Sequence, residues 1–230
     1  MADIYLIRHG QASFGQANYD ALSSLGIKQA GMIGDGFNKR GVGFDRVIKG
    51  SMQRHAQTAE HCLSRMDYSG EVEVDARFNE YDHEEVLVRL KPEFADKADM
   101  ASYLAASPNP RKAFQLALQE AIQRWMSGQH DHDYTESWLE FKNRCHSALF
   151  DIVKNAGNAK HIAVFTSGGP VSLAVQAALH LPDETAIQLS WSTVNGSVTR
   201  FQHNRERVSL SFFNDYSHFE SVDSSTVTQR

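Results

Sequence analysis

Arg8 and His9 stand side by side near the N-terminus, directly after the apolar run Ile4 to Ile7 and before Gly10. A neutral imidazole can attack phosphorus, and an arginine presents a fork of hydrogen-bond donors to phosphoryl oxygens. A glycine at the next position lets the backbone come close to a ligand. The tripeptide alone also fits an ordinary loop histidine. A phosphate-binding role therefore depends on whether other residues suited to phosphate lie close to it.

A second arginine follows another short apolar run. Gly50 and Ser51 end that run, and Arg54 falls in the first turn of the helix expected after it. The N-terminus of a helix favours anions. Two arginines on one phosphate neutralise the dianion and oppose the charge that builds up during transfer. Arg54 alone would be a solvated helix residue, but Arg8 and Arg54 together predict a phosphate pocket.

The elements that position these residues alternate along the chain. Short apolar runs predict strands at residues 4–7, 45–49, 71–74 and 161–166. Helices are expected at residues 23–39, from about 52 to 66, and 137–152, the last opened by a capping box at Ser137 and Glu140. An antiparallel pair is expected at 197–201 and 208–213, around residues 204–206. This order predicts an α/β fold, with a mostly parallel mixed sheet between two helical layers.

Residues from about 84 to 135 lack the alternation of strands. Apolar side chains recur at helical spacing from Phe114 to Trp125, Pro108 and Pro110 interrupt the stretch, and Gly128 ends it. The prediction is one domain over residues 1–230, with a helical cap inserted at about 84–135.

A third turn, from Ser167 to Pro170, follows the strand at 161–166 and places a proline to start the next helix. Ligands of such sheets bind beyond the carboxyl ends of the strands. All three turns follow a strand, so we expect them to share one edge of the sheet.

Composition narrows the class of protein. Of the 230 residues 41% are hydrophobic and 22% charged, as in a folded protein, and the net charge of -5 argues against nucleic-acid binding. Cys62 and Cys145 fall inside helices, which indicates buried thiols in a reducing compartment. Neither a signal peptide nor a membrane span is evident, so a cytoplasmic protein is expected. No sequence pattern indicates an oligomeric state.

The chain resembles the histidine phosphatase superfamily, the phosphoglycerate-mutase-like enzymes of branch 1. The similarity follows family order over nearly the whole chain, through Leu6 to Gln11, Leu22-Ser23, Gly26, Gln29-Ala30, Ser51, Arg54, Thr58-Ala59, Glu80, Glu136-Ser137, Asn214-Asp215 and His218. The resemblance implies the fold of phosphoglycerate mutase and chemistry without a metal or other cofactor. The expected ligand is a small phosphorylated substrate or inorganic phosphate.

The resemblance also implies roles for single residues. His9 matches the histidine that takes the phosphoryl group, and Arg8 and Arg54 match the phosphate-binding arginines. Glu80 matches the acid that protonates the leaving oxygen, a role favoured by the raised pKa expected of a carboxyl group beside phosphate. Asp82, two residues on, is the alternative acid.

One departure concerns the third turn, where the family usually carries a second histidine and this chain has Ser167. Ser167 and Gly168 are the expected phosphate-binding residues there, through the serine hydroxyl and the free N–H groups of the next helix. If the bond is felt only in the transition state, the exchange of a charge-assisted bond for a neutral one is expected to lower the rate about five- to thirtyfold, which weakens catalysis without abolishing it. His55 or His83 is a candidate for the missing imidazole, the alternative being that both are surface histidines.

Two further features depart from the pattern or suggest another site. Gly15 stands where many relatives carry asparagine, which leaves Gln16 or Asn18 as substitutes. His130 and His132 could suggest a metal, but no second ligand cluster accompanies them, which favours a solvated loop.

Three functions remain in order of preference. The first is a metal-independent phosphomonoester hydrolase that works through phosphorylated His9. The second is a degenerate member that binds phosphoesters or partner proteins with little turnover, for which Ser167 and Gly15 are the support. The third is a phosphoglycerate-type mutase, which is disfavoured because basic residues of the cap are interleaved with acids.

Overall fold

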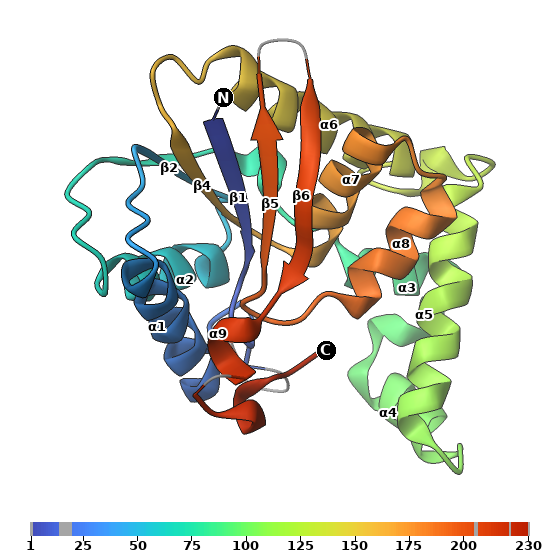
Figure 1. Ribbon diagram of the computed structural model, residues 1–230. Coiled ribbons are helices and arrows are strands. Elements are labelled where there is room, and N and C mark those ends of the chain that lie inside the picture. The colour runs from blue at the N-terminus through green and yellow to red at the C-terminus, as the bar shows by residue number, and fades with distance from the viewer. Residues whose placement is uncertain (1, 14–19, 205–206, 221, 230) are drawn as a thin grey trace. The chain divides into compact units, whose positions relative to one another are not determined.

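The sheet has strands of both orientations (Figure 1). The computed structural model describes the chain except for residues 1, 14–19, 205–206, 221 and 230. In this part of the chain six strands pair in the order β3-β2-β4-β1-β5-β6. Their bounds are β1 (Ala2–Arg8), β2 (Arg46–Lys49), β3 (Val72–Val74), β4 (His161–Thr166), β5 (Val198–His203) and β6 (Val208–Asp215). The first four run parallel, and β5 and β6 complete the sheet in antiparallel pairing.

Helices pack on both faces of this sheet. They are α1 (Ser24–Lys39), α2 (Gln53–Leu63), α6 (Trp138–Lys154), α7 (Gly168–Leu179), α8 (Asp183–Ser192) and α9 (Ser217–Glu220). Side chains of α1, α2 and α9 pack in one core cluster, and those of α6 and α7 in another. None of the helices in the described ranges is long and apolar enough to cross a membrane.

Strand β1 shows why its sequence is an unbroken apolar run. Ile4 and Leu6 belong to the cluster under α6 and α7, while Tyr5 and Ile7 belong to the cluster under α1 and α2. A strand covered on both faces needs apolar side chains at every position. The predicted three-layer α/β fold with a mostly parallel mixed sheet is therefore confirmed.

The boundaries of α2 and α7 differ from the prediction. Helix α2 ends at Leu63 rather than near residue 66. Helix α7 begins at Gly168, two residues before Pro170, so that Ser167 is its N-cap. Proline is tolerated inside the first turn because the N–H groups there have no acceptor within the helix. Helices α8 and α9 were not predicted, and residues 205 and 206 of the predicted turn lie outside the described residues.

The chain divides into two compact units, residues 1–80 with 144–230, and residues 81–143. The second unit contains α3 (His83–Leu90), α4 (Lys97–Ala105) and α5 (Pro110–Met126). Its core is aromatic, with the Tyr81 and Trp125 ring centroids 4.9 Å apart and Trp125 also against Phe141. At residues 137–140 the predicted capping box is present, since the Ser137 N–H donates to the Glu140 carboxylate at 2.8 Å.

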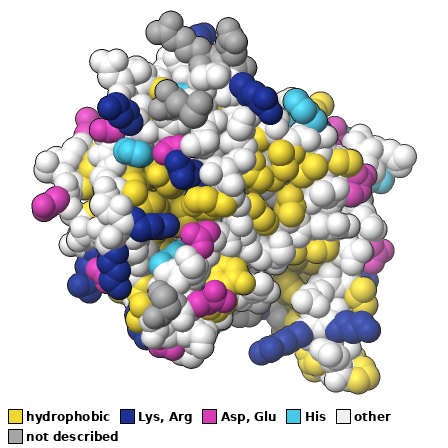
Figure 2. Space-filling view, viewed as in Figure 1, with side chains coloured by type: hydrophobic (Ala, Val, Ile, Leu, Met, Phe, Trp, Pro, Cys, Tyr) yellow, Lys and Arg dark blue, Asp and Glu magenta, His cyan; other side chains and the backbone are white. Residues whose placement is uncertain are grey.

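Hydrophobic side chains reach the surface where the sheet ends at β6. Val208, Leu210 and Phe213 of this edge strand are only partly buried, as is Leu189 of α8. Figure 2 shows hydrophobic side chains gathered over the middle of this face, where β6 runs. The strand is thus apolar without being covered as β1 is.

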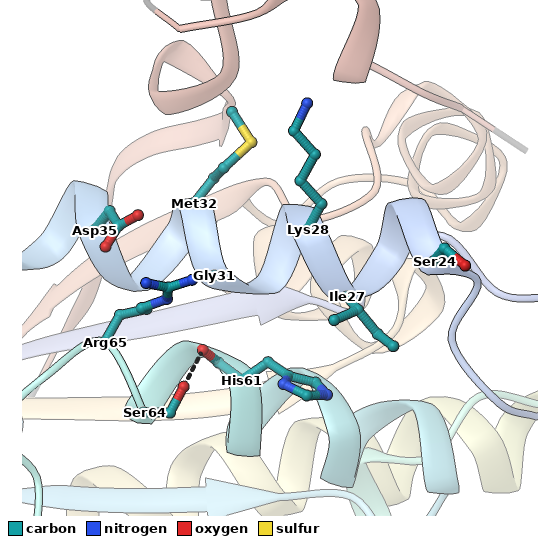
Figure 3. Close-up of a pocket in the computed structure, with 9 residues that line it drawn as sticks. All are labelled: Ser24, Ile27, Lys28, Gly31, Met32, Asp35, His61, Ser64 and Arg65. Atoms are coloured by element: carbon teal, nitrogen blue, oxygen red, sulfur yellow. Dashed lines mark hydrogen bonds between the residues drawn. The ribbon is translucent and has the colours of Figure 1, made fainter.

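Helices α1 and α2 approach each other closely at Gly34. A Cβ atom there would lie 2.2 Å from the Cys62 carbonyl oxygen. Gly31, one turn earlier, opens onto a surface hollow of about 600 Å³ that Arg65 also lines (Figure 3). A Cβ at Gly31 would meet the Arg65 guanidinium at an ordinary 3.5 Å. Backbone contact at Gly34, and not helix propensity, therefore fixes the spacing of the two helices.

Gly34→Ala is expected to destabilise the protein by about 1–3 kcal/mol, because the new methyl group must push α2 away from α1. Gly31→Ala is the matched control in the same helix. It should be neutral or stabilising by up to about 1 kcal/mol, the gain of alanine over glycine in a helix interior. Urea denaturation of the parent and both variants measures the difference. Equal stability of the two variants would contradict the close contact at Gly34.

Candidate active site

The three turns that follow β1, β2 and β4 lie at one edge of the sheet. Strand β4 is central, with Arg8 of β1 paired to Thr166 and Lys49 of β2 paired to Phe165. The backbone continues this pairing beyond the strands, because the His9 N–H donates to the Thr166 carbonyl at 2.8 Å. The predicted common edge is confirmed. It brings residues of β1, α2 and α7 together.

His9 is held with one particular nitrogen available. Its side chain is buried, and Nδ1 lies 2.7 Å from the Gly10 carbonyl oxygen. A carbonyl only accepts, so Nδ1 carries the proton and Nε2 keeps its lone pair. Burial lowers the pKa of His9 well below its ordinary value, and the positive charges of Arg54 and Arg8 lower it further. The imidazole is therefore neutral at neutral pH, the form that can attack phosphorus.

Arg8 and Arg54 are both buried, with 3% and 6% of their surface exposed. The Arg8 Nη1 donates to the Thr193 carbonyl at the end of α8. The Arg54 Nη1 donates to the Asp20 carboxylate at 2.9 Å. The other oxygen of Asp20 accepts from the Gln53 N–H at 2.7 Å. Arg54 and the start of α2 thus already bind one oxyanion, as expected for a helix N-terminus.

Gly10 is required by a close backbone approach. A Cβ at Gly10 would lie 2.5 Å from the Gly26 carbonyl oxygen, and one at Gly26 would lie 2.2 Å from the Gln11 carbonyl oxygen. The Gly10 N–H also donates to the Thr58 hydroxyl, which donates to the Arg54 carbonyl at 2.7 Å. The sequence predicts that Gly10 lets the backbone come close to a ligand. In the structure, Gly10 instead lets the backbone come close to the first turn of α1.

Glu80 reaches the start of α7 from the segment after β3. Its Oε2 accepts from the Gly169 N–H at 3.1 Å. The residues before it are fixed, since the Arg144 guanidinium donates to the Asn79 carbonyl at 2.8 Å and the Thr166 hydroxyl to the Phe78 carbonyl at 2.6 Å. Asp82, the alternative acid, is the N-cap of α3 and accepts from the Glu85 N–H.

Ser167 and Gly168 form the third part of the site. Ser167 is fully buried, and its Oγ lies 2.7 Å from Nε2 of His55. A Cβ at Gly168 would lie 3.7 Å from the Arg8 Nε, which places this residue beside that guanidinium. His55 is also fully buried, with its ring centroid 5.9 Å from that of His9. The alternative that His55 is a surface histidine is therefore wrong, because the residue faces the sheet edge and not solvent.

The sequence also singles out other residues as candidates. His83 is the first residue of α3 in the second unit. The His132 side chain is 82% exposed, as predicted for a solvated loop. Among the described residues no group of three or more histidine, cysteine or acidic side chains could hold a metal ion. Cys62 and Cys145 are buried free thiols, as predicted. Gly15, Gln16 and Asn18 lie outside the described residues.

Several site residues escaped the sequence analysis. Asp20, Thr193 and Arg144 act through contacts between segments far apart in the chain, which leave no local pattern. Asn79 could have been suspected from the sequence, because it directly precedes Glu80. Its side chain accepts from the Ser51 N–H at 2.8 Å and donates to the Ser51 hydroxyl at 2.7 Å, which ties the acid segment to the turn before α2.

The chain matches a known protein family. A model of the histidine phosphatase superfamily (branch 1) matches residues 4–114 and 110–216. The chain belongs to this superfamily. Membership supports phosphoester hydrolase or mutase activity, and the predicted family resemblance is confirmed. No match was found among curated proteins.

Solved structures of the superfamily's fold cover nearly the whole chain. Phosphoglycerate mutase from Bacillus anthracis str. Sterne aligns with a TM-score of 0.66 and 17% identity, over 95% of each chain. A variant phosphoserine phosphatase from Entamoeba histolytica in complex with phosphoserine aligns at 0.64 and 18%, over 95% of this chain and 99% of its own. A mycobacterial glucosyl-3-phosphoglycerate phosphatase with inorganic phosphate aligns at 0.62 and 20%, with the same coverage. These similarities show a phosphoglycerate-mutase-like fold.

The free energy of unfolding should fall as pH falls from about 6.5 to 4. Burial lowers the pKa of His9 and His55 and takes that of His218 to about 4. Unfolded histidines titrate near 6.5, so below that pH the unfolded chain binds more protons than the folded one. Each group contributes at most about 1.4 kcal/mol per pH unit between its two pKa values. Urea midpoints at pH 7, 6 and 5 give the slope, and His9→Ala should make it shallower. An unchanged slope in that variant would show that His9 is not held neutral.

Proposed function

We propose that the protein is a phosphomonoester hydrolase that works through phosphohistidine on His9. The observation that carries this proposal is the state of His9. Its Nδ1 proton is bound to the Gly10 carbonyl at 2.7 Å, so its Nε2 lone pair is available beside two buried arginines. The low pKa of the same ring keeps that lone pair free of a proton at neutral pH. Membership in the superfamily supports the same chemistry.

The first half of the reaction transfers the phosphoryl group to the protein. The Nε2 lone pair of His9 forms a bond to phosphorus while the bond from phosphorus to the ester oxygen breaks. The leaving oxygen takes a proton from the Glu80 carboxyl group, and an alcohol departs. Arg8 and Arg54 oppose the charge on the transferred oxygens, with the Gly168 N–H at the start of α7 as a further donor.

The second half releases phosphate. The Glu80 carboxylate takes a proton from water, the water oxygen forms a bond to phosphorus, and the bond from Nε2 to phosphorus breaks. Inorganic phosphate leaves, and both side chains return to their starting states. Each proton has a donor and an acceptor on this chain or in water, and none of these steps calls for a metal or other cofactor.

Aryl phosphate hydrolysis, assayed without added metal, should be abolished in His9→Ala. Alkaline quenching after reaction with a labelled phosphate ester should trap label on the parent and none on the variant, because phosphohistidine survives alkali. Turnover that persists in His9→Ala would exclude the proposed intermediate. Binding of inorganic phosphate to the parent without turnover or label would favour the degenerate binding protein, and transfer of label to a second hydroxyl of a phosphorylated acid would favour the mutase.

Glu80→Gln should lower kcat by roughly 10²- to 10⁴-fold on an alkyl phosphate, which needs a general acid. On a nitrophenyl phosphate, whose leaving group departs without a proton, kcat/KM should fall much less, because it reports only the transfer to His9. The kcat value should fall on this substrate too, because Glu80 also takes the proton from water in the second half. The glutamine oxygen can still accept from the Gly169 N–H, so the segment keeps its anchor. Asp82→Asn is the control, because Asp82 caps α3. If Asp82→Asn, and not Glu80→Gln, shows the dependence on leaving group, then Asp82 is the acid and the assignment of Glu80 is wrong.

A further inference from the structure

His55 is a fully buried histidine in a polar part of the sequence. It lies in the first turn of α2, next to Arg54, yet none of its surface is exposed. Its Nε2 lies 2.7 Å from the Ser167 Oγ, and its ring lies 5.9 Å from that of His9. One buried imidazole thus links the second turn of the site to the third.

The surroundings of the ring decide which nitrogen carries its proton. The other nitrogen, Nδ1, is buried and has no hydrogen-bond partner among the described residues. It lies against Gly50, where a Cβ would be 2.2 Å from it. A proton on Nδ1 would be a buried donor without an acceptor, which is costly, so the proton belongs on Nε2. Burial, and then the charges of Arg54 and Lys49, lower the pKa of His55 and keep it singly protonated.

This assignment fixes the role of the serine hydroxyl. Nε2–H donates to Ser167 Oγ, so the hydroxyl accepts from His55 and keeps its own proton to donate. A serine at an N-cap ordinarily accepts from the N–H groups of the first turn. Ser167 is the N-cap of α7 and makes no such bond, and the Gly169 N–H is bound by Glu80 instead. No acceptor for the Ser167 hydroxyl proton is present in the described part of the chain.

We propose that His55 is a positioning residue that holds the Ser167 hydroxyl as a hydrogen-bond donor to the transferred phosphoryl group. The inference rests on the proposed hydrolase function and adds the device that completes its pocket. No proton is transferred in this role. The imidazole of His55 fixes the hydroxyl oxygen, and the hydroxyl proton bonds to a non-bridging phosphoryl oxygen. Two neutral side chains together supply a directed donor beside Arg8.

A double-mutant cycle on kcat for an aryl phosphate tests whether His55 acts through Ser167. His55→Ala and Ser167→Ala should each lower kcat roughly tenfold, the effect of one hydrogen bond made in the transition state. The double variant should also lose about tenfold, not a hundredfold. Multiplicative losses, or parent kcat in His55→Ala, would overturn the proposal. Melting temperatures measured in parallel separate the loss of packing from the loss of the donor.

Two further variants distinguish a donor from a filler of space. His55→Gln keeps an N–H near the position of Nε2 and should recover most of kcat, whereas His55→Leu keeps apolar volume and should not. The exchange His55→Ala with Ser167→His moves the imidazole to the other side of the contact and should recover kcat to within a fewfold of the parent. Ser167→His alone should lose activity, because the new ring must displace His55. Equal activity of the Gln and Leu variants would leave only a packing role.

Nitrogen NMR gives a readout that does not depend on turnover. In the parent, the His55 resonances should report a proton on Nε2, and saturation with inorganic phosphate should shift them. The phosphate-induced shift should disappear in Ser167→Ala. A proton on Nδ1, or no response to bound phosphate, would overturn the inference even in an inactive protein. Persistent activity of His9→Ala would instead refute the phosphohistidine mechanism, so the two failures are distinct.

Discussion

Two buried guanidinium groups and a buried imidazole share the carboxyl edge of the sheet, and contacts from distant segments hold them in place. Positive charges are costly to bury without partners. Arg54 is bound by the Asp20 carboxylate and Arg8 by the Thr193 carbonyl, each from a segment remote in sequence. Burial, and then the same charges, lower the pKa of His9 and keep the ring neutral. In the proposed function, a bound phosphate dianion would relieve the cost of burying the arginines, so one electrostatic arrangement would supply both phosphate affinity and an unprotonated nucleophile.

The hydrogen bonds around the site connect its parts in a closed chain. Thr58 joins the first turn to α2, Asn79 joins the acid segment to the turn before α2, and Glu80 joins that segment to α7. His55 closes the chain from α2 to Ser167. Pairs of these contacts share an element, so displacement of one turn would disturb the others. Side chains placed this way are held before a ligand arrives, which catalysis by electrostatic preorganisation requires.

The fold and the location of the site could be predicted from the sequence, because both depend on local patterns. The apolar run before Arg8 predicts a strand covered on both faces, and the turns after β1, β2 and β4 share an edge by the rule for parallel sheets. What could not be predicted depends on tertiary contacts. The burial of His55 cannot be predicted from its own segment, because the neighbouring residues are polar as well. The diversion of Ser167 from its capping role depends on a partner 112 positions away. Pro170 predicts a start of α7 near that residue, whereas the helix starts at Gly168.

The crossing of Gly10 over Gly26 has a consequence for how freely this site can vary. A Cβ atom at Gly10 would lie 2.5 Å from the Gly26 carbonyl oxygen, and one at Gly26 would lie 2.2 Å from the Gln11 carbonyl oxygen. Neither clash can be relieved by a rotamer change, because both partners are main-chain atoms. Both positions must therefore be glycine because there is no room for a side chain, whatever reaction the site carries out. A variant sequence could exchange Ser167, His55 or Glu80 and keep this architecture, whereas a single added methyl group at the crossing would move His9, the proposed nucleophile.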